Sequence, residues 1–286
     1  MTDLYFVPGG IGKCISFTSL LARIENPIAV CSGWKSLFQD HPKVYGSYDM
    51  TSFYEPEKNE YFSSYFNNFF YLDPYYSKHF LKDKKHISEC FQLMRGIEMP
   101  TKQSEVFFNK KDVEDLASII NEIDPFVMVQ FSGSDDTFLK EDDLYTRSLN
   151  RKQAQEIINI LNFDLKLNVI NVKNPDDTST YENLCQIQHT LDFKKYMTLL
   201  SFSRGFIGVD SFLQHASSNK NKIINGVVLW GSTSSQLFGY DHNINLQTKA
   251  PYQMVFETND IMDSFSSLGK VQESKKIMST LKVDAS

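Results

Sequence analysis

The sequence is poor in the features that mark membrane proteins and disulfide-rich secreted proteins. No apolar run reaches about 18 residues, the length that a membrane-spanning helix needs, so we expect no membrane span. The start of the chain, "MTDLYFVPGG", lacks the basic and then apolar order of a secretion signal. The 4 cysteines lie far apart and form no C-x-x-C pair. We therefore expect reduced, mostly buried thiols and a cytoplasmic protein.

Spacings typical of metal sites are also missing. None of the 6 histidines pairs with another at i, i+4 or with a cysteine, so we expect no zinc site. The acidic segment "SDDTFLKEDD", residues 134–143, matches no calcium or magnesium loop, and a solvated loop is favoured over a cation site. No metal ligand is therefore predicted.

The charge balance excludes a broad electrostatic preference for polyanions. The net charge is −6, from 35 acidic and 29 basic side chains, so nothing global indicates binding to nucleic acid or to an anionic membrane surface. Hydrophobic residues make up 41% of the 286 residues, which is enough for a real core. The length suggests one large domain or two of ordinary size.

A glycine-rich stretch near the start resembles a phosphate loop but has the wrong spacing. In "FVPGGIGKCIS", Gly12 and Lys13 fit the end of G-x-x-x-x-G-K-[ST], but Val7 and Cys14 occupy its first glycine and its hydroxyl position. The dinucleotide fingerprint G-x-G-x-x-G also fails, because Ile15 stands where the third glycine belongs. What remains is a strand, a glycine turn and a helix, either as an anion-binding turn or as a plain start of an α/β domain.

Strand and helix patterns alternate along the chain in two series. In the first series, strands are expected at 4–7, 27–32 and 43–49, and helices at 14–24, 84–97 and 110–123. In the second, strands are expected at 125–134, 167–174, 205–211 and 224–235, and helices at 151–164, 192–203 and from 212 onward. Two such series predict two doubly wound α/β halves, residues 1–124 and 125–286. The last segment, 260–281, is expected to be helical, and packing against the N-terminal half is one option for it.

The most informative stretch is "GFIGVDSFLQHASSNKNKIINGVVLWGST", residues 205–233. One apolar strand ends at Asp210 and Ser211, a helix begins at once, and His215 lies one turn into it. A second apolar strand ends at Trp230 and Gly231. Ligands of open α/β sheets bind outside the carboxyl ends of the strands, so both strand ends are expected to face one crevice.

This stretch resembles a known family of enzymes. "GVDSFLQHAS" is similar to the DSG-x-x-H-x-A signature of the heptosyltransferase-like glycosyltransferases, and "VVLWGST" is similar to the strand that follows it there. "FVMVQFSGS" and "GGIGKCISFTSLL" resemble the first strand of that family's C-terminal half and the first glycine turn of its N-terminal half. The resemblance implies a GT-B fold, two Rossmann-like doubly wound domains facing a cleft. It also implies sugar transfer from a nucleotide-sugar donor without a metal ion, the donor being a co-substrate, so that no cofactor is expected.

The resemblance assigns residues to a donor site in the C-terminal half and an acceptor site in the N-terminal half. By position, it places donor contacts on the first glycine turn, on the first strand of the C-terminal half and on the 205–233 stretch: Gly10, Gly12, Ser132, Gly133, Asp210, Ser211, His215, Gly231, Ser232 and Thr233. Arg147, in "LYTRSL", falls near the family's basic residue for the diphosphate, where a guanidinium would stabilise the leaving nucleotide. A surface arginine is an equal alternative.

The sequence departs from the family at the general base. The family often ends its first glycine turn with an aspartate that deprotonates the acceptor hydroxyl, whereas this chain has Lys13. A protonated lysine cannot accept that proton, although it can contact a phosphate or an anionic acceptor. Asp73, among aromatic residues in "YLDPYYSKHF", is the first substitute, with Asp49 and His79 behind it. The alternative for Asp73 is a plain turn before Pro74.

A short basic segment, "KHFLKDKKH", suggests where an acceptor binds. Lys78, His79 and Lys82 are the predicted acceptor contacts, and aromatic residues lie close by in the sequence. Such a segment is either a solvated helix face or a surface for a phosphodiester backbone. The acceptor is then a glycan of the lipopolysaccharide type or a hydroxymethylated base of duplex DNA, which would have to flip out. A nucleotide- or glycan-binding relic without turnover is the competing interpretation, and the loss of the aspartate at position 13 is its main support.

Overall fold

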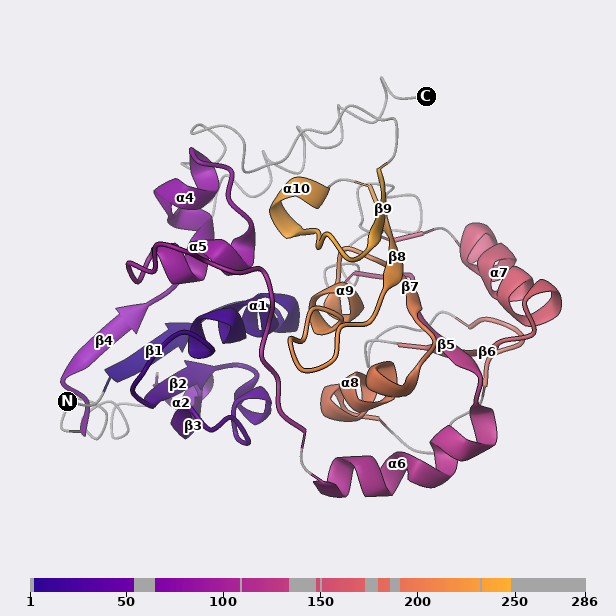
Figure 1. The fold of residues 1–286 in the computed structure, drawn as a ribbon, viewed down its shortest axis with the longest axis horizontal. Coiled ribbons are helices and arrows are strands. Elements are labelled where there is room, and N and C mark those ends of the chain that lie inside the picture. Colours follow the sequence, from indigo (N-terminus) through magenta and orange to yellow (C-terminus); the bar gives the residue numbers. More distant parts are fainter. Residues whose placement is uncertain are drawn as a thin grey trace. The chain divides into compact units, whose positions relative to one another are not determined.

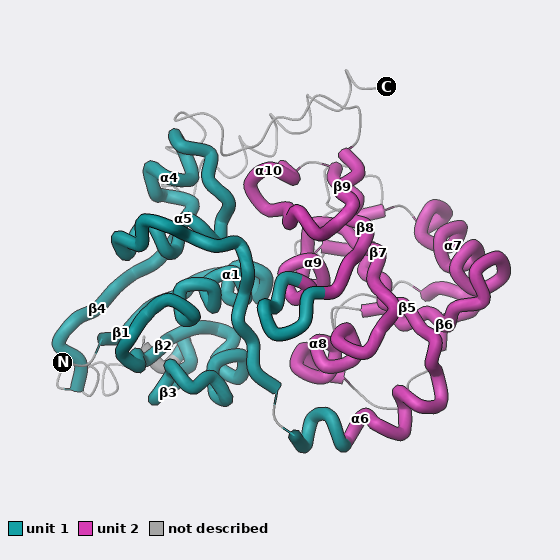
Figure 2. Tube along the Cα trace, viewed as in Figure 1, with its two compact units in different colours: residues 1–114, 218–223 teal, residues 115–217, 224–286 magenta. Residues whose placement is uncertain are grey.

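The computed structural model divides into two compact units. It describes residues 3–53, 65–108, 110–133, 148–149, 151–172, 180–185, 191–231 and 233–247. Unit 1 comprises residues 1–114 and 218–223, and unit 2 comprises residues 115–217 and 224–286 (Figure 2). The chain therefore leaves unit 1 within helix α6 (Lys110–Ile123) and returns to it for six residues after unit 2 has begun.

Unit 1 is built on a four-stranded parallel sheet. Its strands are β1 (Asp3–Val7), β2 (Ile28–Ser32), β3 (Val44–Asp49) and β4 (Asn68–Tyr71), in the order β3-β2-β1-β4. The apolar runs of β1 and β2 are buried, as expected for the central strands of a parallel sheet. β4 was not expected from the sequence, because aromatic residues at consecutive positions hide the strand pattern.

Helices α1 (Ile11–Leu21) and α5 (Ile87–Leu93) pack together in unit 1 (Figure 1). Phe17 of α1 meets Phe91 of α5 edge to face, with ring centroids 5.5 Å apart. α5 begins in a capping box, in which the His86 ring accepts from the Ser88 N–H and Glu89 accepts from the His86 N–H. The shorter elements are η1 (Lys35–Leu37), α2 (Met50–Phe53), η2 (Pro74–Tyr76) and α4 (Lys78–Leu81).

Unit 2 holds a five-stranded parallel sheet in the order β6-β5-β7-β8-β9. The strands are β5 (Phe126–Gln130), β6 (Asn168–Asn171), β7 (Phe206–Val209), β8 (Gly226–Trp230) and β9 (Ile244–Gln247). The helical elements are α7 (Arg151–Asn159), its continuation η4 (Ile160–Asp164), α8 (Phe193–Phe202), α9 (Phe212–Ala216) and α10 (Ser235–Phe238). α7 lies on one side of the strands and α8, α9 and α10 on the other (Figure 1).

The expected alternation of strands and helices is confirmed over most of the described residues. The short strand β9 is an addition, and the helix expected at 260–281 lies outside the described residues. The thiols are free, with Cys14, Cys31 and Cys90 buried and Cys185 half-buried. Burial raises the pKa of Cys14 to about 11 and that of Cys90 to about 12.

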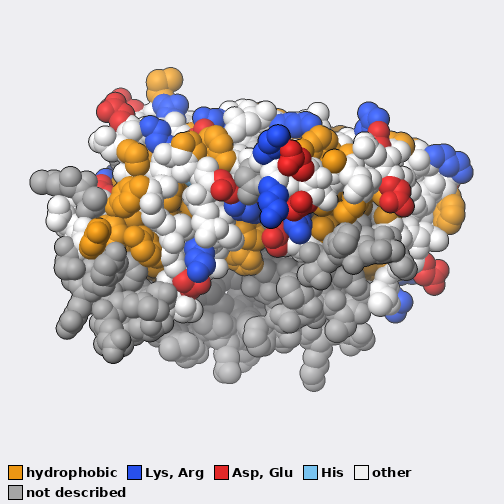
Figure 3. Space-filling view, turned by 90° about the horizontal axis from the view of Figure 1, so that it is seen from below, with side chains coloured by type: hydrophobic (Ala, Val, Ile, Leu, Met, Phe, Trp, Pro, Cys, Tyr) orange, Lys and Arg blue, Asp and Glu red, His pale blue; other side chains and the backbone are white. Residues whose placement is uncertain are grey.

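One face of the described part of the molecule carries mixed charge (Figure 3). On the face shown in Figure 3, basic and acidic side chains lie next to one another with apolar side chains between them. Within the described ranges, no helix has the length and apolar character needed to cross a bilayer.

Candidate functional site

The edge of the unit 2 sheet at the carboxyl ends of β5 and β7 is its topological switch point. β6 lies on one side of β5 and β7 on the other, so the connections leave this edge in opposite directions. Open α/β sheets form ligand crevices at such a point, because the loops there part from each other. The segments that follow β5, β7 and β8 contain most of the predicted donor contacts.

Gln130, the last residue of β5, links the two strands at this point. Its side-chain amide donates to Ser211 Oγ at 3.0 Å, and its Oε1 accepts from the Leu213 N–H at 3.0 Å. Gln130 is 3% exposed, so these two bonds fix the start of α9 to the end of β5. The Leu213 N–H, one of the first amides of α9, is therefore already bonded to Gln130. The Ser211 side chain at this turn is half-buried. Gln130 carries no motif in the sequence that would single it out.

Asp210 and His215 are buried in a hydrogen-bonded cluster behind Ser211. Gln214 Nε2 donates to Asp210 Oδ1 at 2.7 Å and lies 3.3 Å from His215 Nε2. His215 Nδ1 lies 3.0 Å from the Tyr240 hydroxyl. With the Gln214 amide in this orientation, His215 Nε2 is the acceptor and Nδ1 carries the proton. The Gln214 Oε1 atom is buried and has no hydrogen-bond partner within the described part of the chain.

The remaining predicted donor contacts are only partly described. Ser132 is half-buried, and the buried Gly133 donates its N–H to Ser148 Oγ at 3.1 Å. Gly231 is exposed at the end of β8 and accepts from Gln247 Nε2 at 3.3 Å. Thr233 is half-buried, and its Oγ1 has no partner within the described ranges. Two further predicted contacts, Arg147 and Ser232, lie outside the described residues.

The sheet of unit 1 has its own switch point, between β1 and β4. β2 and β3 lie on one side of β1 and β4 lies on the other. Lys13, one turn into the helix after β1, meets Asp73 two residues after β4. Lys13 Nζ lies 3.1 Å from both carboxylate oxygens, and the two side chains are 9% and 11% exposed. The structure thus brings together two of the three residues predicted to be catalytic, although 60 positions separate them.

Tyr75 and the turn geometry hold this ion pair in place. The Lys13 ammonium lies 4.3 Å from the centre of the Tyr75 ring, a cation–π contact. Asp73 is also the N-cap of η2 and accepts from the Tyr75 N–H, so the turn expected as the alternative is present together with the ion pair. Asp49 is separated from β4 by β2 and β1, and it caps α2 by accepting from the Thr51 N–H.

The glycine turn after β1 is shaped for the Lys13 side chain. Gly9 has φ +100°, and a Cβ atom there would come within 2.8 Å of Lys13 Cε. Gly10 is the N-cap of α1 with φ −72°, and it faces open space. Gly12 lies in the first turn of α1, in unit 1. Gly9, which the sequence analysis did not single out, is therefore the glycine that the geometry requires.

Exposed aromatic and basic residues flank Asp73 in the chain. Tyr71, at the end of β4, is 65% exposed and Tyr76 is 55% exposed. Lys78 and Lys82, at the start and the C-cap of α4, are exposed. His79 is half-buried, and its Nδ1 lies 3.0 Å from Asp83 Oδ2. Within the described ranges, no three histidine, cysteine or acidic side chains gather as metal ligands would.

Comparisons with known proteins agree with this architecture. No protein-family model matches the chain, and no curated protein matches it by sequence. A glycosyl transferase of family 9 from Veillonella parvula aligns with a TM-score of 0.65 and 10% identity, over 99% of this chain and 97% of its own. The Escherichia coli ADP-heptose lipopolysaccharide heptosyltransferase II aligns with a TM-score of 0.64 and 12% identity, over 100% of both chains.

A third solved structure extends the comparison to a nucleotide complex. The E. coli heptosyltransferase WaaC with ADP aligns with a TM-score of 0.54 and 10% identity, over 96% of this chain and 100% of its own. The likeness to heptosyltransferases expected from residues 205–233 is thus confirmed at the level of the fold. With its two parallel sheets, this chain has the GT-B fold.

Proposed function

We propose that the protein is a glycosyltransferase that moves a sugar from a nucleotide-sugar donor to an acceptor hydroxyl. The observation that carries this proposal is the Lys13–Asp73 pair at the switch point of unit 1. The resemblance implies an aspartate at the end of the first glycine turn, where this chain has Lys13. Asp73 brings a carboxylate to this position, because it contacts Lys13. Support comes from the fold, since the solved structures that it matches are named as glycosyltransferases.

The donor is assigned to the C-terminal half, 125–286, and the acceptor to the N-terminal half, 1–124. Ser211 and Gly231 are the proposed contacts to the diphosphate. Ser211, which follows β7, is half-buried, and Gly231, which follows β8, is exposed, so a ligand can reach both. Asp210 and His215 are 4% and 5% exposed, so we assign them to positioning that turn. The contributions of Gly10, Gly12, Ser132, Gly133, Arg147, Ser232 and Thr233 remain part of the proposal as the resemblance gives them.

The reaction we propose is a single inverting displacement without a metal ion. The acceptor oxygen attacks the anomeric carbon, its proton passes to Asp73, and the bond to the nucleotide diphosphate breaks with its electron pair leaving on the diphosphate oxygen. Lys13 positions Asp73 by contacting both carboxylate oxygens. The location expected for the reaction is the cytoplasm.

The acceptor is a glycan of the lipopolysaccharide type or a hydroxymethylated base of DNA. Tyr71 and Tyr76 offer exposed rings on either side of Asp73 in the chain, suited to stacking on a sugar or a base. Lys78 and Lys82 follow and suit phosphate groups in either acceptor. Mass spectrometry of DNA and of glycans from cells that express the chain distinguishes the two acceptors.

The test of the proposal is nucleotide release from a panel of nucleotide sugars. We expect release with at least one donor, and a loss of about 100-fold or more in kcat for Asp73→Asn, the usual size of a general-base contribution. Asp83→Asn is the matched control, because Asp83 is a half-exposed carboxylate that contacts His79. Heat protection by a nucleotide sugar without any release would instead support the binding protein without turnover.

A further inference from the structure

The side chain of Gln130, at the end of the interior strand β5, makes two hydrogen bonds whose direction is fixed. Its Oε1 accepts from the Leu213 N–H, which is a backbone group that only donates. The other end of the amide, Nε2, must therefore be the group that donates to Ser211 Oγ at 3.0 Å. A flipped amide would place two donors against each other at Leu213, so this orientation is the one that the contacts allow.

The neighbouring strand makes room for this side chain at Gly208. Gln130 is paired with Gly208 of β7 in the ladder, and a Cβ atom at Gly208 would lie 3.8 Å from Gln130 Cβ. Glycine inside a strand costs packing and marks a place where another group comes close. Gly208 therefore leaves the Gln130 side chain room to cross β7 and to reach the turn at Ser211.

The bond from Gln130 determines what the Ser211 hydroxyl can offer to a ligand. A hydroxyl has one proton and two lone pairs, and the Gln130 amide occupies one lone pair of Ser211 Oγ. Among the described residues, this is the one hydrogen bond of Ser211 Oγ, so its proton is available for a ligand that accepts. Ser211 is half-buried, and a ligand can therefore reach it.

We propose that Gln130 is a positioning residue that makes the Ser211 hydroxyl a hydrogen-bond donor for an anionic ligand. A phosphate oxygen is such an acceptor, and a hydroxyl with a preset direction binds it at a lower cost of ordering. Gln130 itself is 3% exposed, so it acts through Ser211 and does not touch the ligand. The inference rests on the proposed function in one point, which is that the anion is the diphosphate of the donor.

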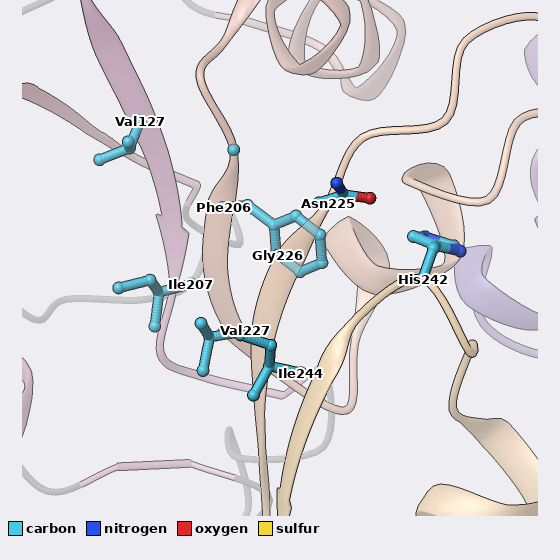
Figure 4. A pocket seen from close by; sticks show the side chains of 9 residues that line it. Val127, Phe206, Ile207, Asn225, Gly226, Val227, His242 and Ile244 are labelled. Atoms are coloured by element: carbon cyan, nitrogen blue, oxygen red, sulfur yellow. The ribbon is translucent and has the colours of Figure 1, made fainter.

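A shallow hollow at the other end of the same strands is less suited to an anion (Figure 4). It has a volume of about 340 Å³, and most of its lining side chains are apolar: Val127, Phe206, Ile207, Val227 and Ile244. His242 also lines it, and its Nε2 lies 3.0 Å from Ser217 Oγ, which itself donates to the Gln214 carbonyl. His242 Nε2 therefore donates, and burial lowers the pKa of the ring, so the neutral form leaves Nδ1 as an acceptor. We therefore expect the anion at Ser211 and not in this hollow.

The test measures the binding of inorganic pyrophosphate to the full-length protein by calorimetry, in a buffer that contains a chelator. Gln130→Glu keeps the size of the side chain and both contacts, but its carboxylate only accepts, so the Ser211 proton turns toward it. We expect the dissociation constant of pyrophosphate to rise by about tenfold or more at about pH 8. The loss is expected to shrink at lower pH, because a protonated Glu side chain again donates to Ser211. Unchanged affinity in Gln130→Glu overturns the inference, as does a wild-type protein that does not bind pyrophosphate.

The negative charge of Gln130→Glu also repels pyrophosphate directly, and Ser211→Ala separates the two effects. In a Ser211→Ala background, Gln130→Glu is expected to weaken binding by about threefold or less, because the hydroxyl that it would turn is gone. Gln130→Met provides the same comparison without a charge, and it is expected to weaken binding only where Ser211 is present. Equal losses in both backgrounds overturn the inference.

Nucleotide release from the panel of nucleotide sugars separates this inference from the proposed function. Release by the wild-type protein, together with a pyrophosphate affinity that does not depend on Gln130, overturns the inference and leaves the proposed sugar transfer intact. Loss of pyrophosphate affinity in Gln130→Glu, with no release from any nucleotide sugar, supports the role of Gln130 and contradicts the sugar transfer.

Discussion

The Lys13–Asp73 pair joins the start of α1, which follows β1, to the turn that follows β4, and the proposed chemistry depends on it. Both side chains are about nine-tenths buried, and each is the other's charged partner at 3.1 Å. A buried charge that loses its partner destabilises the fold more than the pair itself stabilises it, because the remaining charge keeps its desolvation cost.

We therefore predict strong coupling between the two residues. Lys13→Met and Asp73→Asn are each expected to lower the free energy of unfolding by about 1–3 kcal/mol. The double variant is expected to lose less than the sum, with a coupling of at least about 0.5 kcal/mol in denaturant unfolding. Strictly additive losses would contradict the pairing.

A second residue, His41, is expected to make the stability of unit 1 depend on pH. Burial lowers the pKa of His41 to about 4, and the nearby Glu105, 3.6 Å away, only partly opposes this. The Lys43 N–H donates to His41 Nδ1, so the neutral ring carries its proton on Nε2. The unfolded chain binds this proton at about pH 6.5, and the folded chain does so only near pH 4.

The stability contributed by neutral His41 is expected to be lost as the pH falls from about 6.5 to about 4. The unfolded state binds more protons throughout this window, so the free energy of unfolding decreases, by up to about 3 kcal/mol. His41→Asn keeps an acceptor for the Lys43 N–H and removes the titration. The free energies of unfolding of the wild-type protein and of His41→Asn, measured across this window, are expected to converge at low pH. A difference that stays constant with pH would refute the assignment.

At the scale of elements, the turn between β1 and α1 has two adjacent glycines with different requirements. Gly9 adopts φ +100° and leaves room for the Lys13 side chain, whereas Gly10 has φ −72° and open space around it. The difference follows from the backbone angle of Gly9 and from the Lys13 side chain beside it, and it provides a matched pair of substitutions.

Gly9→Ala is expected to destabilise the protein by about 1–3 kcal/mol and to weaken the Lys13–Asp73 pair, because the new Cβ meets Lys13 Cε. Gly10→Ala is expected to change the stability by less than about 0.5 kcal/mol. Thermal unfolding of both variants checks this, and similar losses for the two would show that the turn does not act on Lys13.

The elements also show what could be predicted from the sequence. Apolar runs such as "IAVCS" and "FVMVQ" predict their strands because burial in a parallel sheet selects such runs. β4 and β9 were not predicted. "NFFY" and "INLQ" are short edge strands, and they form only by pairing with β1 and β8, which the sequence pattern does not reveal. Asp73 was proposed from its aromatic neighbours, but its contact with Lys13 depends on β4 lying beside β1. Gln130 and Tyr240 act through partners distant in the sequence and were not recognisable beforehand.

At the scale of the whole molecule, residues 218–223 bind to unit 1 although α9 of unit 2 precedes them. Ser104 forms a parallel bridge with Asn219, and the Ser104 N–H donates to the Ser218 carbonyl at 3.1 Å. The Asn219 side chain accepts from the Val106 N–H and donates to the Val106 carbonyl. Asn219 is 3% exposed, so both bonds are shielded from water.

Asn219→Ala is expected to loosen this segment. Two shielded backbone groups of Val106 lose their partner, at a cost of about 1–3 kcal/mol. Limited proteolysis is expected to cut the chain within 218–223 more rapidly in Asn219→Ala than in Asn221→Ala, whose side chain is not a partner of Val106. Equal cleavage rates would show that the Asn219 side chain does not hold the segment.

Because the chain returns into unit 1 at residues 218–223, we do not expect that it can be divided into two halves that fold on their own. A fragment that ends at Glu114 lacks the six residues that pair with Ser104 and Val106, and the complementary fragment carries them without their binding site. Two such fragments are therefore expected to fold only when both are present. A circularly permuted chain is expected to fold only when its new ends leave residues 217–224 uncut.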